Sequence, residues 1–368
     1  MKILAVHQGA ELYGSDRSFF LSISILRKKY PEATVEVILH EDGPLRKELE
    51  KIVIVRISKL SKLSKAALKR FNFSFVLYFI KNLLQIPKIR RYDILYINTI
   101  VILDFIFLCR FVKSQVKPII HVREIQGGIV GQFFKWLLSF SNAYLIFNSR
   151  ETMDSFYPQP SSNHFVVNNG VKGLANISSP TVDTLNILLL GRVNKWKGQD
   201  FFLEVMGEMI RRGHQDIKLR IVGSVFKSQE HILEELHALV ETNNLKDHVA
   251  FFEFTDTIDS HLSWSNLVAV PSIKPEPFGR VAIEGMSASR PLIVADHGGL
   301  AGIVDHLVTG YKFKPGDVAS AVAGLEYYLA DKERIHTMGE AAKNAFKMKY
   351  SEEKYDQNFT EVIARIVD

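Results

Sequence analysis

The chain has 368 residues, of which 47% are hydrophobic and 23% charged, and its formal net charge is +6. This composition excludes a disordered or fibrous protein, and the length predicts two domains that each bury a core. The N-terminus shows no signal-peptide pattern, and charged residues interrupt the apolar runs at 71–87 and 100–112. We therefore expect a cytoplasmic protein without a membrane span, with its one cysteine, Cys109, buried and reduced.

Apolar segments of strand length alternate with segments of helix length along the first half of the chain. Such alternation predicts βαβ units that build a parallel sheet. The expected strands are KILAVH at 2–7, ATVEVILH at 33–40, KIVIVRI at 51–57, DILYINT at 93–99, KPIIHV at 117–122, AYLIFN at 143–148 and HFVVNNG at 164–170. After the first strand, a loop with Gly9 and Gly14 opens a helix near Ser15 or Asp16. Its free N–H groups suit an anion, although Asp16 as a simple helix cap explains the same pattern.

Basic residues concentrate between Arg56 and Arg91, where ten of them occur with no acidic residue. The rest of the chain has fewer basic than acidic residues, so the positive charge is local and predicts a surface for an anionic partner other than nucleic acid. Lysine alternates there with leucine and aromatic residues, as in an amphipathic helix on the anionic inner face of a membrane. An ordinary solvated helix face explains the pattern equally well.

The same alternation starts again after KGLANISSPTVDT, a polar segment with Gly and Pro that we interpret as the linker. The second series of expected strands is TLNILLLGRV, IKLRIVG, HVAFFEF, NLVAVPS, RPLIVAD and GYKFKP. The predicted fold is α/β, with doubly wound, Rossmann-like domains at 1–175 and 176–348 and a C-terminal helix at 349–368 that returns to the first domain. Ligands of such domains bind at the carboxyl ends of the strands, so we expect the site in a cleft that both domains face.

Two loops of the second domain carry charges suited to a ligand. Arg192 and Lys197 follow the strand that ends at Gly191, where they could neutralise a diphosphate or be merely solvated. Within PEPFGRVAIE, Glu276 lies in a loop after a buried strand and Glu284 lies inside a helix. Carboxylates can accept from paired hydroxyls, while a helix-start charge and a solvated helix residue are the alternatives. The chain has no dinucleotide-binding or P-loop motif.

The segment EPFGRVAIE resembles the E-x7-E motif of the retaining family-4 glycosyltransferases, which have the GT-B fold. Further segments resemble that family in the same order along the chain, namely YGSDRS, DGPLRKEL, DILYINT, HVRE, NNGV, GRVNKWKGQDFFLEV, LRIVGS, VAVPS and HGGLAGIVDHLVTGYKFKPGD. The resemblance implies transfer of a sugar from a nucleotide-diphosphate sugar to a hydroxyl acceptor. The basic, leucine-rich stretch from Arg56 to Arg91 favours a lipid-linked saccharide as that acceptor, in the synthesis of a cell-surface polysaccharide such as lipopolysaccharide.

The resemblance also implies roles for individual residues. Glu284 would bind the ribose hydroxyls, and Glu276 would contact the transferred sugar. Arg192 and Lys197 would hold the diphosphate, and His121 would reach the sugar from the first domain. The implied catalytic residues are Glu276, His121, Arg192 and Lys197. The implied donor-binding residues are Gly14, Ser15, Arg192, Lys197, Phe252, Glu253, Phe254, Glu276, Phe278, Gly279, Arg280, Val281 and Glu284.

Three positions depart from the usual pattern of the family. Gly302 replaces an acidic residue, Tyr13 stands where a glycine is common, and Glu253 stands where glycine is frequent. The Glu276/Glu284 and Arg192/Lys197 pairs remain, so we expect an active enzyme. The implied mechanism is front-side attack by the acceptor hydroxyl, whose proton goes to the departing diphosphate. With no D-x-D motif, we expect neither metal nor cofactor. A non-catalytic nucleotide-sugar-binding module and a nucleotide-sugar epimerase are the alternative functions.

Overall fold

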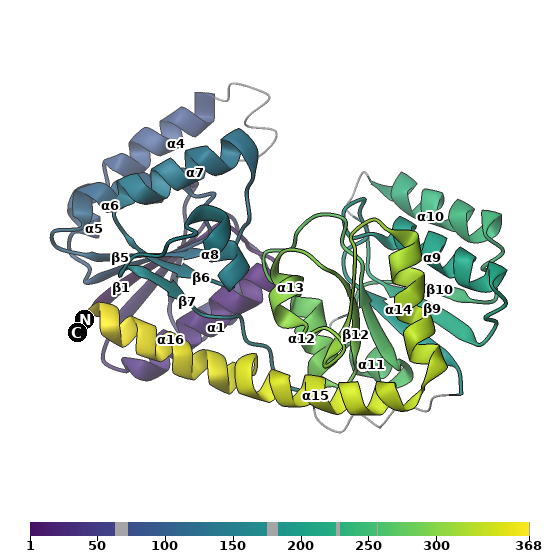
Figure 1. The fold of residues 1–368 in the computed structure, drawn as a ribbon. Coiled ribbons are helices and arrows are strands. Elements are labelled where there is room, and N and C mark those ends of the chain that lie inside the picture. Colours follow the sequence, from purple (N-terminus) through teal and green to yellow (C-terminus); the bar gives the residue numbers. More distant parts are fainter. Residues whose placement is uncertain (63–72, 175–182, 226–228, 256, 368) are drawn as a thin grey trace. The chain divides into compact units, whose positions relative to one another are not determined.

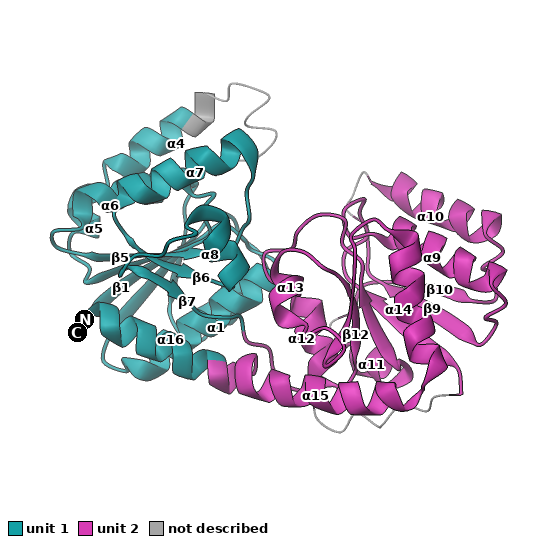
Figure 2. Cartoon of the chain, viewed as in Figure 1, with its two compact units in different colours: residues 1–169, 355–368 teal, residues 170–354 magenta. Residues whose placement is uncertain are grey.

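The computed structural model describes residues 1–62, 73–174, 183–225, 229–255 and 257–367 (Figure 1). The chain forms two compact units (Figure 2). Unit 1 comprises Met1–Asn169 with Tyr355–Asp368, and unit 2 comprises Gly170–Lys354. Most of the expected linker, 175–182, lies outside the described residues, as do Lys65, Lys69 and Arg70 of the basic stretch.

Unit 1 contains a seven-stranded parallel sheet in the order β3-β2-β1-β4-β5-β6-β7. Its strands are β1 (Lys2–His7), β2 (Thr34–Leu39), β3 (Ile54–Ile57), β4 (Ile94–Asn98), β5 (Lys117–Val122), β6 (Tyr144–Phe147) and β7 (His164–Val166). The chain builds outward from β1 to β3 and then crosses back to β4 on the other side of β1. The strand order therefore reverses between β1 and β4, and ligands favour the carboxyl edge of a parallel sheet at such a point.

Helices cover both faces of this sheet, because successive side chains of a strand point to opposite faces. The helices are α1 (Gly14–Lys29), α2 (Pro44–Glu50), α4 (Phe73–Leu83), α5 (Ile86–Ile89), α6 (Leu103–Val112), α7 (Gly128–Ser141), α8 (Arg150–Phe156) and α16 (Glu352–Val367). In β1, Leu4 and Val6 pack in the same core as α6, α7 and α8. The alternate residues Ile3 and Ala5 pack in the core that α1, α2 and α16 share.

The C-terminal helix α16 supplies part of the core of unit 1. Phe359 and Ile363 of this helix are fully buried, four residues apart on one face. Phe359 stacks on Tyr355 with ring centroids 5.5 Å apart and lies edge-on to Tyr96 of β4 at 5.9 Å. The hydroxyl of Tyr355 is 2.6 Å from Ser22 Oγ of α1. The end of the chain thus closes one face of the sheet with which the chain begins.

Unit 2 contains a six-stranded parallel sheet in the order β10-β9-β8-β11-β12-β13. The strands are β8 (Leu185–Leu190), β9 (Ile217–Val222), β10 (Val249–Phe252), β11 (Leu267–Val270), β12 (Leu292–Ala295) and β13 (Gly310–Phe313). The helices are α9 (Gln199–Arg211), α10 (Glu230–Thr242), α11 (Asp259–Trp264), α12 (Arg280–Ser287), α13 (Gly299–Ile303), α14 (Val318–Ala330) and α15 (Glu333–Lys349). Helices α9, α10 and α14 pack on one face, and α12 and α13 pack on the other.

The predicted α/β architecture of two doubly wound units is confirmed, and strands form in both expected series. Strand β3 is shorter than the expected 51–57. Helix α2 ends at Glu50, and the turn that follows it holds the next residues through bonds from Lys51 N to Glu48 O and from Val53 N to Leu49 O. Within the described residues, no helix has both the length and the hydropathy needed to cross a bilayer.

The packing of α16 predicts a large loss of stability in Phe359→Ala. Truncating a fully buried phenylalanine leaves a cavity, and we expect the free energy of unfolding to fall by about 3–5 kcal/mol in a urea titration. Asp356→Ala is the control on the same helix, because it removes a largely exposed 3.0 Å ion pair with Lys28 and a 3.1 Å hydrogen bond from Thr360 Oγ1, and it should cost about 1 kcal/mol or less. Equal losses in both variants would show that α16 is not part of the core.

Candidate functional site

The strongest candidate site is an ion pair at the carboxyl edge of the sheet in unit 2. Lys197 Nζ lies 2.8 Å from Glu276 Oε1, and the two side chains are 16% and 7% exposed. The hydroxyl of Ser272 donates to the same carboxylate oxygen. Lys197 lies in the loop after β8, and Glu276 lies in the loop after β11. Since β8 and β11 are neighbours in the sheet, residues that are far apart in sequence meet at one edge.

Backbone contacts between these loops hold the pair in place. Gly198 has φ +77°, and a Cβ at this position would lie 2.1 Å from the carbonyl oxygen of Pro271. Only glycine accommodates both this left-handed conformation and this close approach. The amide of Ile273 donates to the carbonyl of Trp196 at 2.8 Å. The loop after β8 is therefore fastened to the end of β11, and Lys197 is brought to Glu276.

The loop after β12 adds a third attachment. Gly299 N donates to Glu276 O at 2.7 Å, and a ring nitrogen of His297 lies 2.7 Å from Ser272 O. A Cβ on Gly298, which has φ +56°, would lie 2.5 Å from Glu276 O. Three consecutive strands, β8, β11 and β12, thus end in loops that converge on Glu276.

The second glutamate of the motif lies one turn into α12. Glu284 Oε1 accepts from Arg280 Nε at 3.0 Å, an i,i+4 pair whose side chains are partly buried. Gly279 caps the helix with φ +111°, and a Cβ there would lie 2.6 Å from a methyl group of Leu300. Both predicted carboxylates therefore have a cation beside them. Within the described part of the chain, no group of three or more His, Cys, Asp or Glu side chains is arranged to hold a metal ion.

The other expected donor residues of unit 2 lie around the same edge. Arg192 is half-buried just after β8, and its carbonyl accepts from Gln199 Nε2 at 3.1 Å. Phe252 ends β10, the outer strand, and is partly exposed beneath the guanidinium of Arg220 at 5.1 Å. Phe254 and Glu253 follow it and are exposed. A donor-binding role for this segment stays a prediction.

His121 of unit 1 is fully buried on β5. Its Nδ1 lies 2.8 Å from the Tyr96 hydroxyl and 3.3 Å from Arg123 Nη2. Because a guanidinium only donates, Nδ1 accepts and the proton sits on Nε2, which is buried without a hydrogen-bond partner. Burial, reinforced by the charge of Arg123, lowers the pKa of His121 well below its ordinary value of 6.5. The imidazole also stacks on Phe359 of α16, with ring centroids 6.3 Å apart.

This environment makes His121 a neutral core residue, not a proton donor at the surface. A direct contact between His121 and a sugar stays a prediction, and it requires the neighbours of His121 to move. Gly14 and Ser15 are exposed at the start of α1, where a ligand can approach them.

A polar cluster at the carboxyl ends of β1, β4 and β5 was missed by the sequence analysis. His7 Nε2 lies 2.8 Å from Asp16 Oδ1, and His7 Nδ1 lies 2.9 Å from Asn98 Nδ2. Arg123 donates from Nε to Asn98 Oδ1 at 2.5 Å and from Nη1 to Asn169 Oδ1 at 2.6 Å. The signal was present, since β1 and β4 each end on a polar residue and Arg123 directly follows β5. Asp16 therefore has two roles. Its Oδ1 contacts His7, and its Oδ2 accepts from Tyr13 N at 3.3 Å at the start of α1, as a helix cap does.

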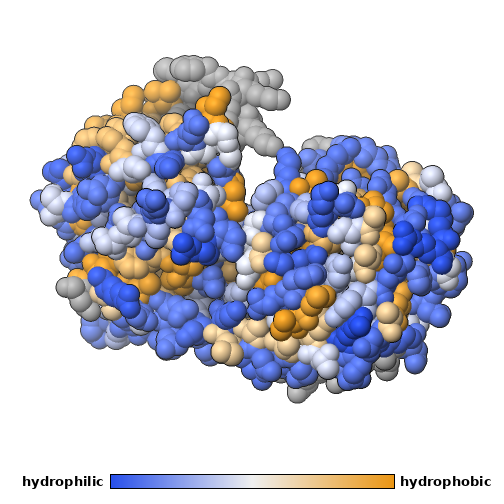
Figure 3. Space-filling model, viewed as in Figure 1, coloured by the Kyte–Doolittle hydropathy of each residue, from blue (hydrophilic) through white to orange (hydrophobic). Residues whose placement is uncertain are grey.

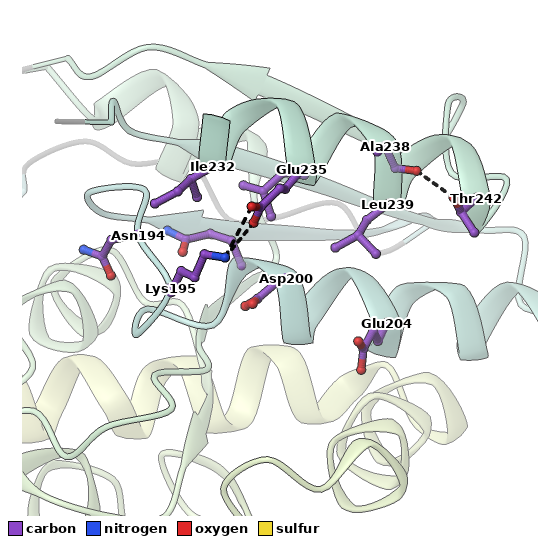
Figure 4. Close-up of a pocket in the computed structure, with 11 residues that line it drawn as sticks. Asn194, Lys195, Asp200, Glu204, Ile232, Glu235, Ala238, Leu239 and Thr242 are labelled. Atoms are coloured by element: carbon purple, nitrogen blue, oxygen red, sulfur yellow. Dashed lines mark hydrogen bonds and ion pairs between the residues drawn. The ribbon is translucent and has the colours of Figure 1, made fainter. Parts of the chain in front are cut away.

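A cavity of about 380 Å³ opens between α9 and α10 of unit 2 (Figure 4). Asp200, Glu204 and Glu235 line it, and Lys195 pairs with Glu235 at 2.9 Å. With three carboxylates to one ammonium, this cavity repels a diphosphate. We therefore place the candidate site at the Lys197–Glu276 pair.

Comparison with known proteins gives matches to glycosyltransferases. Residues 177–345 match the family model of glycosyl transferases group 1. An uncharacterised glycosyltransferase of Methanocaldococcus jannaschii is 31% identical over 172 residues, which cover 46% of this chain and 42% of that protein. The lipopolysaccharide 1,2-N-acetylglucosaminetransferase of Salmonella typhimurium is 31% identical over 185 residues, covering 49% and 48%. These matches span less than half the length of the curated relatives.

Solved structures match over nearly the entire chain. HepE of Anabaena in complex with UDP has a TM-score of 0.82 at 20% identity, covering 99% of this chain and 100% of that one. The lipopolysaccharide outer core galactosyltransferase WaaB in its apo form has a TM-score of 0.78 at 15% identity, with 99% of each chain covered. At these identities the likeness establishes the fold, and the predicted GT-B fold of two Rossmann-like units is confirmed.

The environment of His121 predicts that its imidazole stays neutral in mildly acidic solution. In the unfolded chain this histidine takes up a proton near pH 6.5, whereas in the folded protein it does so only at lower pH. Its contribution to stability is therefore complete above pH 6.5 and is lost as the pH falls below that value. In NMR spectra of histidine-labelled protein, the signal assigned by its loss in His121→Gln should not titrate between about pH 7 and 5.5. A midpoint near 6.5 would contradict this environment.

Proposed function

We propose that this chain, whose residues 177–345 belong to the family of group 1 glycosyl transferases, moves a sugar from a nucleotide-diphosphate sugar to a hydroxyl acceptor with retention of configuration. The observation that carries the proposal is the buried Lys197–Glu276 pair at the carboxyl edge of β8 and β11, within the matched segment. Related structures whose descriptions name UDP and UDP-glucose support UDP as the nucleotide.

The pair suits a site that must accept and release a diphosphate. Glu276 lies 2.8 Å from the ammonium of Lys197, and the attraction between the two charges offsets the desolvation penalty of this little-exposed cation. A diphosphate brings stronger negative charge, to which the flexible lysine can turn. Glu276 is then free to accept hydrogen bonds from sugar hydroxyls. When Lys197 exchanges Glu276 for the diphosphate, Glu276 becomes available to the sugar, so binding of the diphosphate would favour binding of the sugar.

The proposed reaction needs little covalent chemistry from the protein. The acceptor oxygen forms a bond to the anomeric carbon as the bond from that carbon to the diphosphate breaks, and the hydroxyl proton goes to the departing oxygen. Lys197 and Arg192, both in the loop after β8, would stabilise the charge that develops on the diphosphate. The loop that carries Lys197 is held by the hydrogen bond from Ile273 N to Trp196 O and by the close approach of Gly198 to Pro271, so the backbone position from which the lysine side chain reaches the diphosphate is fixed.

We further propose that the acceptor is a lipid-linked saccharide and that the protein acts at the inner face of a membrane in the synthesis of a cell-surface polysaccharide. The lipopolysaccharide transferase among the relatives supports this acceptor class. The basic residues between Arg56 and Arg91 support the location.

Binding of UDP should raise the melting temperature more than binding of GDP, ADP or dTDP. A ligand that binds only the folded state stabilises it by about 2.7 kcal/mol at a concentration 100 times Kd, which shifts the melting temperature by several degrees. A thermal-shift series with the four diphosphates measures this directly. An equal response to all four would exclude selection of the base by this chain.

Glu276→Ala and Lys197→Ala should each lower kcat/KM for transfer from the donor by about 10²-fold to 10³-fold, because each removes a group that acts on the sugar or on the leaving diphosphate. The matched control is the exposed pair Lys195–Glu235 in the same unit. Lys195→Ala and Glu235→Ala remove the same side-chain types and should leave kcat/KM within about twofold.

Three outcomes of this experiment would count against the proposal. Equal activity in the Glu276→Ala variant and the wild type would show that Glu276 has no role in transfer. Binding of donor without any transfer would indicate a non-catalytic module. Interconversion of the donor sugar without acceptor would indicate an epimerase.

A further inference from the structure

The large exposed hydrophobic side chains of unit 1 concentrate on three helices. They are Val76, Leu77 and Ile80 of α4, Leu84 just after it, Phe111 of α6, and Ile129, Val130, Phe133 and Trp136 of α7. We call this set the α4–α7 face. Ile129 is 85% exposed and Trp136 is 56% exposed. Single exposed apolar residues are ordinary, but a set on neighbouring helices marks an interaction surface.

Aromatic contacts show that the α4–α7 face is continuous. From α7, Trp136 stacks on Phe140, with ring centroids 5.6 Å apart, and Phe140 stacks on Phe107 of α6 at 5.2 Å. Phe107 in turn contacts Phe79 of α4 at 5.6 Å and Phe111 at 5.3 Å. The helices lie side by side in Figure 1, and hydrophobic residues are visible over α4 in Figure 3. The rings therefore link all three helices under one apolar surface.

The exposed charged side chains on α4, α5, α6 and α7 all have one sign. Exposed basic residues surround it, namely Lys81, Lys88, Arg90, Arg110 and Lys135. Helices α4, α5 and α7 have no acidic residue, and the one in α6, Asp104, is fully buried. Asp104 accepts from Ser61 N at 2.8 Å and from Asn82 Nδ2 at 2.6 Å, so it does not offset the surface charge. An apolar centre with a purely basic rim needs a partner that is apolar and anionic.

We propose that the α4–α7 face docks on the surface of a bilayer that contains anionic lipids. The aromatic and aliphatic side chains would enter the interface, where tryptophan is favoured, and the basic side chains would lie among lipid phosphates. A second copy of the chain fits less well, because two such faces would bring their basic rims together. The inference rests on the membrane location proposed above. Because membrane binding can be measured without sugar transfer, the proposed docking and the proposed transfer can each fail without the other.

The face differs from the surface expected from the sequence. Lys81, Lys88 and Arg90 do belong to the basic stretch between Arg56 and Arg91. The side chains of α7, however, lie some forty residues further along the chain and supply its tryptophan. Only the packing of α6 against both α4 and α7 brings these segments into one surface.

Tryptophan fluorescence of the unmodified full chain gives the first test. The chain has three tryptophans, and Trp136 is the one on the face. Vesicles of phosphatidylglycerol and phosphatidylcholine should shift the emission to shorter wavelength as Trp136 leaves water, and the shift should be absent in Trp136→Phe. Vesicles of phosphatidylcholine alone, or about 1 M salt, should reduce the shift severalfold.

Vesicle sedimentation of surface variants gives the second test. Phe133→Ser combined with Trp136→Ser should weaken binding to the anionic vesicles about tenfold or more, because the apolar area that inserts is lost. Met348→Ser is the matched control, since Met348 is 70% exposed on α15 of unit 2 and should change nothing. Lys81→Gln with Lys135→Gln should weaken binding severalfold, whereas Lys347→Gln on α15 should not. All of these positions are at the surface, and thermal melts should confirm folding.

Three results would overturn the proposal. The first is no sedimentation of the wild-type chain with anionic vesicles at low salt, and the second is equal sedimentation of the Phe133/Trp136 variant. The third is a concentration-dependent dimer in size-exclusion chromatography that the same variant abolishes, without lipid binding by the wild type. That third result would identify another copy of the chain as the occupant of the face.

Discussion

The contact between Lys197 and Glu276 is the interaction on which the candidate site depends. Neither charge could remain so little exposed alone, because an unpaired ammonium or carboxylate at such a depth loses its hydration without compensation. The pair exists because three neighbouring strands end in loops that are fastened to one another by short backbone contacts. Gly198 and Gly298 make those contacts sterically feasible. The sheet thus fixes the geometry, and the loops supply the charge.

Unit 1 uses the equivalent edge of its sheet differently. Its polar strand ends form a buried chain of hydrogen bonds, from Asp16 through His7 and Asn98 to Arg123. Such a chain is stable because its side-chain donors have acceptors, whereas Nε2 of His121, which neighbours Arg123, is buried without a partner. The surface of the unit on α4, α6 and α7 is apolar and basic. Unit 1 therefore combines a rigid polar edge with a surface suited to an anionic interface.

Much of the fold and part of the site could be predicted from the sequence. The alternation of apolar segments predicted both parallel sheets, because a strand covered by helices on both faces must be apolar throughout. The position of Glu276 after a buried strand and of Glu284 within a helix followed from Pro271, Gly279 and the apolar runs beside them. The polar cluster of unit 1 was missed, although polar residues stand at the ends of β1 and β4 and directly after β5, because a single chain does not reveal which strands become neighbours.

The sequence by itself determined the kinds of element and the charges near their ends. Only the tertiary structure decided the partners: Lys197 with Glu276 across two strands, His121 against Phe359 of the last helix, and α4 and α7 both against α6. The physical reason is that periodicity depends on neighbours within a few residues. The contacts between distant residues depend instead on where the chain crosses over between strands, and a local sequence pattern contains no information about that.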